Sequence, residues 1–234
     1  MTNAILRGKP DAGNPHVRFD EGEVASAKPR RGSLLYIKKL LLLLKHRREV
    51  RMAISTALRL AEGDANAVVL GGLTDEEMRA VCGWAAEGCG KAIVEVGTLF
   101  GLTAREMAAC AVGGRVIAVD DFSWNPFGLP AAVHEAFTRR ILRGTNVELW
   151  KMDSAAFRVH AKELGRIDLI FFDADHRYEA VKAELQWAKS AGISQICGHD
   201  YGNPNPRFGV TRAVNEVFGE ENVEVVGMCW RVKL

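Results

Sequence analysis

Short apolar runs alternate with segments of helical spacing over most of residues 92–234. Five runs are rich in β-branched or aromatic residues and have the length of buried strands: Ala92–Val96, Val116–Val119, Asn146–Lys151, Ile167–Phe172 and Ile193–Cys197. The helical segments that follow them are Leu102–Ala111, Ala131–Leu142, Ala155–Leu164, Tyr178–Ser190 and Gly209–Phe218. Two final strands, Val223–Val226 and Cys229–Val232, predict a hairpin. The pattern predicts an α/β fold: a doubly wound, mostly parallel seven-stranded sheet with a C-terminal antiparallel hairpin.

The N-terminal region lacks this alternation. Residues 1–32 are rich in Gly, Pro, Asn, Lys and Arg, which predicts a disordered tail. Residues 33–73 are expected to form a basic helical extension, capped by Ser33, and a connection. Contact with a membrane surface or a partner is one interpretation of its leucines and basic side chains. The other is packing on the domain or on a second subunit, which makes this helix the expected element of a homodimer.

The domain itself is predicted to occupy residues 74–234. Thr74 and Glu77 have the spacing of a capping box, which starts a helix over Asp75–Ala86. A chain of 234 residues that is 48% hydrophobic can bury one sizeable core.

Composition excludes several classes of protein. The net charge of +2 gives no general attraction to nucleic acid. The longest apolar run, Leu40–Leu44, is far shorter than the ~20 residues of a membrane-spanning helix, and residues 1–19 do not resemble a signal peptide. The five cysteines are scattered without a CxxC pair, which indicates thiols in a reducing compartment. We therefore expect a cytoplasmic protein.

Polar residues follow each predicted parallel strand. They are Gly97–Thr98, Asp120–Asp121, Asp153–Ser154, Asp173–His176 and His199–Asp200. The carboxyl ends of parallel strands meet at one edge of a sheet, where ligands of this fold class bind. A single carboxylate at such a place often only caps a helix, but this many together predict a binding site.

The first turn constrains the ligand. Its sequence, Gly97-Thr98-Leu99-Phe100-Gly101, lacks the middle glycine that lets a pyrophosphate approach the backbone. No loop for a nucleoside triphosphate is present either. Glu95 lies within the preceding apolar strand, where a carboxylate is costly unless it is paired. The turn therefore favours a ligand that contains adenosine without phosphate and has a cationic or donor-rich end.

Six motifs together resemble a known family. The segments VEVGTLFGLT, VIAVDDF, MDSAAF, IDLIFFDADHRYEAV, ICGHDY and GVTRAVNEVF are similar, in this order, to those of class I S-adenosylmethionine-dependent methyltransferases. The branch that the E-x-G-x-x-x-G and D-x-D-H-x-Y motifs resemble contains small-molecule O-methyltransferases. The resemblance covers residues 92–234 and implies a Rossmann-like sheet, S-adenosylmethionine as cofactor and a small hydroxylated acceptor such as a sugar or natural product.

The resemblance also implies residue roles in cofactor binding. Gly97, Thr98 and Gly101 would form the turn under the methionine part of the cofactor. Glu95 would lie behind it, near the amino-acid end or holding the loop. The remaining implied contacts are Asp120 to the ribose hydroxyls with Asp121 beside it, Asp153 and Ser154 to the adenine amino group, and Asp173 at the methyl group.

Two mechanisms for deprotonating the acceptor stay open. In one, Asp173, His199 and Asp200 hold Mg²⁺ or another divalent metal, and the histidine also permits Mn²⁺, Fe²⁺ or Zn²⁺. In the other, His176 or His199 takes the proton directly. The catalytic candidates are therefore Asp173, His176 and His199, with Asp175 in the same cluster.

Other functions have weaker support. A nicotinamide-dependent oxidoreductase of the short-chain type requires a G-x-x-x-G-x-G turn, which this sequence lacks. An inactive methyltransferase-like binding module is expected to lose the cofactor residues, yet Gly97, Asp120 and Asp153 remain. A nucleic-acid substrate is also disfavoured, because the acidic strand end at Asp173–Asp175 repels phosphates.

Overall fold

The computed structural model describes residues 73–87, 92–111, 113–124 and 130–234. The predicted tail, residues 1–32, and the extension up to residue 72 lie outside the described residues, as do the predictions of membrane contact and dimerisation that rest on them. Among the described residues, no helix is long and apolar enough to cross a membrane.

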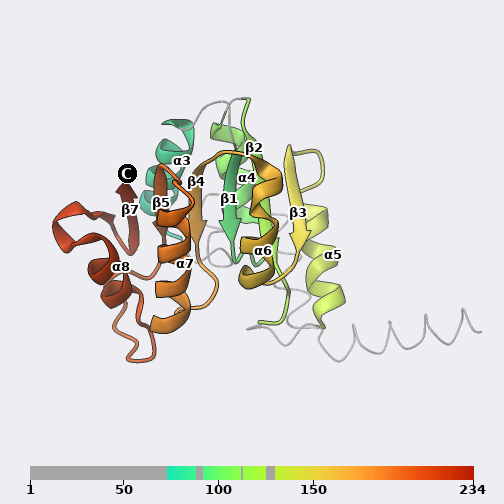
Figure 1. Cartoon of the computed structure of the whole chain (residues 1–234). Coiled ribbons are helices and arrows are strands. Elements are labelled where there is room, and N and C mark those ends of the chain that lie inside the picture. The colour runs from blue at the N-terminus through green and yellow to red at the C-terminus, as the bar shows by residue number, and fades with distance from the viewer. Residues whose placement is uncertain (1–72, 88–91, 112, 125–129) are drawn as a thin grey trace, which may run out of the picture. The chain divides into compact units, whose positions relative to one another are not determined.

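The described chain alternates between strands and helices, as predicted (Figure 1). The strands are β1 (Ala92–Val96), β2 (Arg115–Asp120), β3 (Val147–Lys151), β4 (Ile167–Phe172), β5 (Gln195–Gly198), β6 (Glu224–Val226) and β7 (Cys229–Lys233). The α-helices are α3 (Asp75–Glu87), α4 (Leu102–Cys110), α5 (Ala131–Ile141), α6 (Ser154–His160), α7 (Tyr178–Ser190) and α8 (Val210–Phe218). Short 3₁₀ helices span Ala161–Leu164 and Glu220–Asn222.

The seven strands form one sheet in the order β3-β2-β1-β4-β5-β7-β6. Strands β1 to β5 run parallel, and β7 pairs antiparallel with both β5 and β6. The predicted parallel sheet and terminal hairpin are both confirmed. Because β1 lies between β2 and β4, the chain order reverses there, and this is where ligands bind in open α/β sheets.

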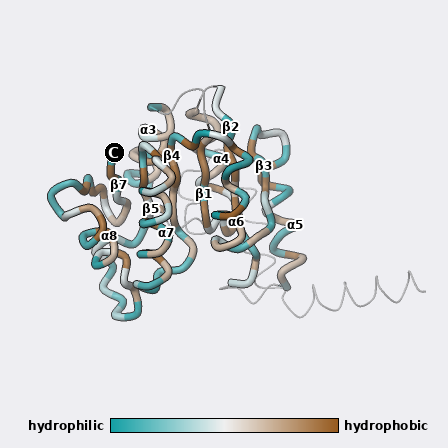
Figure 2. Tube along the Cα trace, in the orientation of Figure 1, coloured by the Kyte–Doolittle hydropathy of each residue, from teal (hydrophilic) through white to brown (hydrophobic). Residues whose placement is uncertain are grey.

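Alternate residues of the central strands enter two different cores. Val94 and Val96 pack with Phe157 of α6 and Leu185 of α7, whereas Ile93 packs on the other face with side chains of α3 and α4. This explains why the central strands read as continuous apolar runs: both faces are covered. Figure 2 shows the resulting hydrophobic colour along β1 and β4.

One predicted boundary shifts for a clear reason. Strand β5 begins at Gln195, two residues after the predicted start at Ile193. The backbone N–H of Ile193 donates to the carbonyl of Ala188 at 3.2 Å, so this residue completes the turn after α7 and cannot yet pair in the sheet.

Candidate functional site at the carboxyl edge of the sheet

The loops after β1, β2, β4 and β5 meet at one edge of the sheet (Figure 1). The β1 and β4 ends touch directly: Gly97 adopts a φ of +91°, and a Cβ there would stand 2.3 Å from the carbonyl oxygen of Asp173. Only glycine fits this conformation and this separation. The first glycine of the turn therefore brings the predicted cofactor turn against the predicted acceptor acids.

The middle of the turn is held by side chains in place of a glycine. Leu99 adopts a left-handed φ of +49°, and its N–H donates to Asp120 Oδ2 at 2.8 Å. Its carbonyl accepts hydrogen bonds from His134 Nε2 and Thr138 Oγ1, both at 2.8 Å. The N–H and the carbonyl group of Leu99 are thus both held by side chains, from β2 and from α5 respectively.

His134 and Thr138 did not emerge from the sequence patterns. His134 is completely buried, its ring centroid lies 4.6 Å from that of Phe100, and its Nδ1 has no hydrogen-bond partner within the described residues. Burial lowers the pKa of this imidazole. The available signal was the i, i+4 spacing of two polar residues on one face of α5, because such residues lie one above the other.

Asp120 stands at the end of β2, as predicted. Its Oδ1 accepts the N–H of Phe122 at 2.7 Å, and burial raises its pKa above the ordinary value. The side chain stays partly exposed, so its oxygens can accept further hydrogen bonds from a ligand hydroxyl. Asp121 is exposed and accepts the N–H of Ser123 at 2.7 Å.

Glu95 has a partner inside the protein. It is only 2% exposed, and its carboxyl group accepts a hydrogen bond from the hydroxyl of Thr98. Burial raises its pKa to about 8. The resemblance implied that Glu95 lies near the amino-acid end of the cofactor or holds the loop, and this geometry corresponds to holding the loop. The cost of burying the carboxyl group, which had suggested a cationic ligand, is offset by the hydrogen bond from Thr98.

The end of β3 carries Asp153 and Ser154. Asp153 is the N-cap of α6, and its Oδ1 accepts the N–H of Ala156 at 2.7 Å. The Ser154 hydroxyl donates to Glu184, a buried residue of α7 whose pKa burial raises to about 7. Within the protein, Asp153 acts as a helix cap and Ser154 as a hydrogen-bond donor to Glu184. The contact of both residues with adenine stays a prediction.

Asp173, His199 and Asp200 come together as expected from their strand ends. Their possible ligand atoms all lie within 4.8 Å of one another. His199 Nδ1 is 3.9 Å from Asp173 Oδ1 and 3.7 Å from Asp200 Oδ2. Two carboxylates and one imidazole are suitable ligands for a divalent cation.

The charges in this group balance one another. Burial raises the pKa of Asp173 to about 7. Burial alone would lower the pKa of His199, but the carboxylates of Asp200, Asp173 and Glu77 raise it above the ordinary value. The pKa of Asp200 is lowered despite its burial, because His199 and Asn203 stabilise the carboxylate.

His176 also lies at this edge, whereas Asp175 turns outward. His176 Nδ1 is 3.3 Å from Asp200 Oδ2, and its ring centroid is 4.4 Å from that of Phe208. Burial lowers its pKa, although its side chain remains 25% exposed. Asp175 instead forms an ion pair with Arg177, with 2.5 Å between Oδ2 and Nη2.

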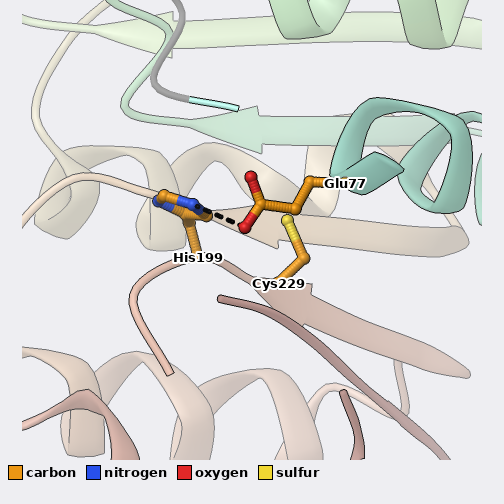
Figure 3. Close-up of side chains that lie close together, drawn as sticks. All are labelled: Glu77, His199 and Cys229. Carbon is orange, nitrogen blue, oxygen red and sulfur yellow. Dashed lines mark ion pairs between the residues drawn. The ribbon is translucent and has the colours of Figure 1, made fainter. Parts of the chain in front are cut away.

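Glu77 of α3 also lies next to His199. Figure 3 shows Glu77 and Cys229 beside His199, with the Glu77 carboxylate pointing toward the ring. Glu77 Oε1 is 3.7 Å from His199 Nε2, and all three residues are buried. The predicted capping box is confirmed, since Thr74 N donates to Glu77 Oε2 at 2.7 Å. The sequence pattern did not predict the second role of this carboxylate next to His199.

A groove among the described residues lies at a different place. It has a volume of about 640 Å³ and is lined near the amino ends of β4 and β5 by residues that include Arg166, Ile167 and Ile193. None of the predicted site residues lines this groove.

Comparisons with known proteins bear on the type of domain and on the fold. Residues 94–201 match the model of a family described as a methyltransferase domain. No curated protein matches the chain.

Several solved structures share the fold. An O-methyltransferase from Bacillus cereus in complex with SAH aligns with a TM-score of 0.55 and 17% identity, over 77% of this chain and 91% of that one. CalS11, a TDP-rhamnose 3′-O-methyltransferase of calicheamicin biosynthesis, gives 0.53 and 19%, over 80% and 92%. TomG from Streptomyces achromogenes, in complex with SAM, gives 0.52 and 13%, over 78% and 89%. Residues 94–201 thus match a methyltransferase domain, and the described residues share the fold of these O-methyltransferases.

Proposed function

We propose that this protein transfers a methyl group from S-adenosylmethionine to a hydroxyl oxygen of a small molecule. The observation that carries the proposal is the direct contact between the two parts of the edge. Gly97 of the cofactor turn packs against the backbone of Asp173, which belongs to the group with His199 and Asp200. A donor bound at the turn and an acceptor bound at this group would be neighbours, as an in-line displacement requires.

The cofactor assignment is supported by the fit of the turn. Asp120 is partly exposed at the end of β2, where its carboxylate can accept hydrogen bonds from ribose hydroxyls. Leu99 and Phe100 leave no open backbone for a diphosphate. When bound, S-adenosylmethionine supplies a methyl group on a sulfonium sulfur; the S–C bond breaks, a C–O bond forms and the hydroxyl proton of the acceptor leaves.

The protein must receive that proton or make the hydroxyl more acidic. Asp173, His199 and Asp200 fit a divalent cation by donor type and by their mutual separation. Such a cation would lower the pKa of an acceptor hydroxyl. His176 is the better placed proton acceptor of the two histidines, because it is more exposed than His199 and its Nδ1 faces Asp200. With Nδ1–H directed to that carboxylate, Nε2 keeps a lone pair for the proton.

The proposed chemical class of the methyl acceptor is based on the structurally similar proteins. One is described as acting on TDP-rhamnose and another as taking part in tomaymycin synthesis. We propose a hydroxylated metabolite of this kind, a sugar or natural-product scaffold.

Thermal unfolding tests the cofactor assignment. S-adenosylmethionine at a hundred times its Kd is expected to stabilise the wild type by about 2.7 kcal/mol, which corresponds to a rise in Tm of roughly 5–10 °C. Asp120→Ala is expected to abolish the rise, whereas Asp121→Ala, the exposed neighbour, is expected to retain it. A wild type that shows no rise at saturating cofactor would contradict the assignment. Transfer of labelled methyl to candidate sugars and phenols then tests the reaction.

A further inference from the structure

The groove at the amino ends of β4 and β5 lies at the edge of the sheet opposite the proposed reaction site. Ile167, the first residue of β4, and Ile193, just before β5, form part of its floor. The helices α6 and α7, which pack on the same face of the sheet, supply its walls (Figure 1). Its volume of about 640 Å³ is typical of pockets that bind small molecules.

The charged side chains that line this groove are all basic. They are Arg158 of α6, Lys162 of the 3₁₀ helix that follows it, and Arg166, which directly precedes β4. The net charge of the whole chain is only +2, so three cations around one groove are a local concentration of positive charge. Such a concentration attracts anions to the groove.

These cations keep donors that no carboxylate of the protein occupies. Within the described part of the chain, Arg158 and Lys162 form no ion pair. Arg166 Nε lies 3.3 Å from Asp168 Oδ1, but 66% of the Arg166 side chain stays exposed. Because a guanidinium group has five N–H donors and an ammonium group has three, the groove can donate several hydrogen bonds to one anion.

An aromatic side chain forms another part of the wall. Trp187 of α7 is half-buried, and its ring centroid lies 5.7 Å from that of Phe157 with an interplanar angle of 76°. This edge-to-face packing holds the indole in place. The indole N–H makes no hydrogen bond to another described residue. Trp187 therefore offers a ligand both an aromatic contact and a hydrogen-bond donor.

Small residues leave space between the cations and the indole. Gly165 and Gly192 line the groove, and no atom lies within 4 Å of a Cβ built on either of them. Ala161 and Ala191 line it as well. Basic side chains near the end of a helix also stabilise that helix, but this role requires neither open space nor an indole beside them. The combination is typical of a ligand site.

We propose that this groove binds a small phosphate-bearing ligand with a planar ring, of the class of the nucleoside diphosphates. Arg158, Lys162 and Arg166 bind the phosphate oxygens through charge-assisted hydrogen bonds. Trp187 contacts the ring of the base. More than one cation in the groove suits a ligand with more than one phosphate. The site is separate from the carboxyl edge, and the inference does not depend on the proposed methyl transfer.

Calorimetry on the full-length protein tests the class of ligand. An excess of S-adenosylhomocysteine is present throughout, so that the probe does not occupy the proposed cofactor turn. Uridine diphosphate is expected to bind, and pyrophosphate is expected to bind roughly 2- to 10-fold more weakly because it lacks the ring. Uridine is expected to show no binding. The proposal is overturned if uridine diphosphate does not bind at about 1 mM, or if uridine binds equally well.

The double variant Arg158→Gln/Lys162→Gln tests the place of binding. Its affinity for uridine diphosphate is expected to fall at least about tenfold, because two charged donors are lost. The matched control is Arg79→Gln/Lys189→Gln, which removes the same two charges from exposed positions of α3 and α7 that do not line the groove. Its affinity is expected to stay within about twofold of wild type. An equal loss in both variants would mean non-specific attraction and overturn the proposal.

The indole N–H signal of Trp187 reports on the groove directly. In ¹H–¹⁵N spectra, with this signal assigned from Trp187→Phe, uridine diphosphate is expected to shift it, whereas the signal of Trp230, buried in β7, is expected to stay in place. Shifts confined to other tryptophans, or an unchanged affinity in Arg158→Gln/Lys162→Gln, would place the ligand elsewhere and refute the assignment. An oligouridylate that binds far more tightly than uridine diphosphate would also overturn it, in favour of RNA.

Discussion

Buried acids in the two proposed halves of the carboxyl edge differ in the direction of their pKa shifts. In the cofactor half, at the ends of β1 and β2, burial raises the pKa of Glu95 and of Asp120. In the acceptor half, the pKa values of Glu77 in α3 and Asp200 at the end of β5 are lowered although both side chains are buried, whereas the pKa of Asp173 at the end of β4 is raised to about 7. At the same edge, burial favours the protonated forms of Glu95 and Asp120, whereas their partners favour the ionised forms of Glu77 and Asp200.

The neighbours explain the difference. Glu77 accepts two backbone N–H groups and faces His199, so its ionised form is stabilised. Glu95 faces the hydroxyl of Thr98 and the negative potential of Asp120 and Asp173. The acceptor half is arranged to keep charges that can hold a cation. In the cofactor half the buried acids favour their protonated forms, and the partly exposed Asp120 keeps oxygens that can accept hydrogen bonds from a ligand.

The junction between the halves is where a substitution should have the largest effect. Gly97→Ala places a Cβ 2.3 Å from the Asp173 carbonyl oxygen, at a φ of +91°. Overpacking and the left-handed backbone together are expected to cost roughly 3–5 kcal/mol. Urea unfolding measures this loss, and calorimetry is expected to detect no binding of S-adenosylmethionine, because the turn and Asp173 are displaced together.

Gly144→Ala separates the cost of overpacking from the cost of a left-handed backbone. Its φ of +80° is similar, but no atom lies within 4 Å of the added Cβ. This control is expected to lose only the backbone contribution, about 1–2 kcal/mol, and to keep its affinity for the cofactor. Equal losses in the two variants would show that close contact between the halves is unimportant.

The charge state of the cofactor half is tested by Glu95→Gln. The folded-state pKa of Glu95, about 8, lies above the ordinary 4.5, so the native state binds the proton more tightly. The stability that this proton contributes is fully present below pH 4.5 and is lost as the pH rises through 8. Relative to wild type, Glu95→Gln should therefore become more stable as the pH rises through this window, by roughly 5 kcal/mol in total and no more than ~1.4 kcal/mol per pH unit.

Urea unfolding at a series of pH values measures that difference. Glu179→Gln, a substitution of an exposed glutamate, should follow the wild-type curve. If Glu95→Gln runs parallel to wild type over the whole range, Glu95 is ionised in the folded state and the contrast between the halves is wrong.

The fold could be predicted from the sequence because both faces of the sheet are covered. Continuous apolar runs such as Ile167–Phe172 mark buried strands, and the polar residues after them mark the edge. Strand ends converge by topology, so Asp173, His199 and Asp200 could be grouped from their positions alone. These inferences need only the local pattern and the parallel order of the strands.

The roles of Glu77 and His134 depend on contacts that local patterns do not encode. Glu77 has the spacing of a cap, and only the packing of α3 beside the β6–β7 turn brings it to His199. His134 lies 35 positions from the carbonyl of Leu99 that it contacts. Glu95 was predicted to need an external cation because its internal partner, the Thr98 hydroxyl, becomes visible only once the turn has a conformation.

The smallest expected effect concerns the support of the cofactor turn by α5. Thr138→Val removes one of the two side-chain donors to the Leu99 carbonyl while His134 keeps the other. The loss of one neutral hydrogen bond is expected to cost about 1 kcal/mol of stability. If part of this energy maintains the left-handed Leu99 conformation that S-adenosylmethionine binds, the affinity measured by calorimetry falls by up to about fivefold.

Thr145→Val is the matched control for this effect. The Thr145 hydroxyl also donates to a backbone carbonyl, that of Leu142, at 2.7 Å, but away from the cofactor turn. It should lose a similar amount of stability with no change in cofactor affinity. A Thr138→Val variant that also binds S-adenosylmethionine like the wild type would mean that Asp120 and His134 alone fix the turn, and the cofactor half would then depend on α5 through a single side chain.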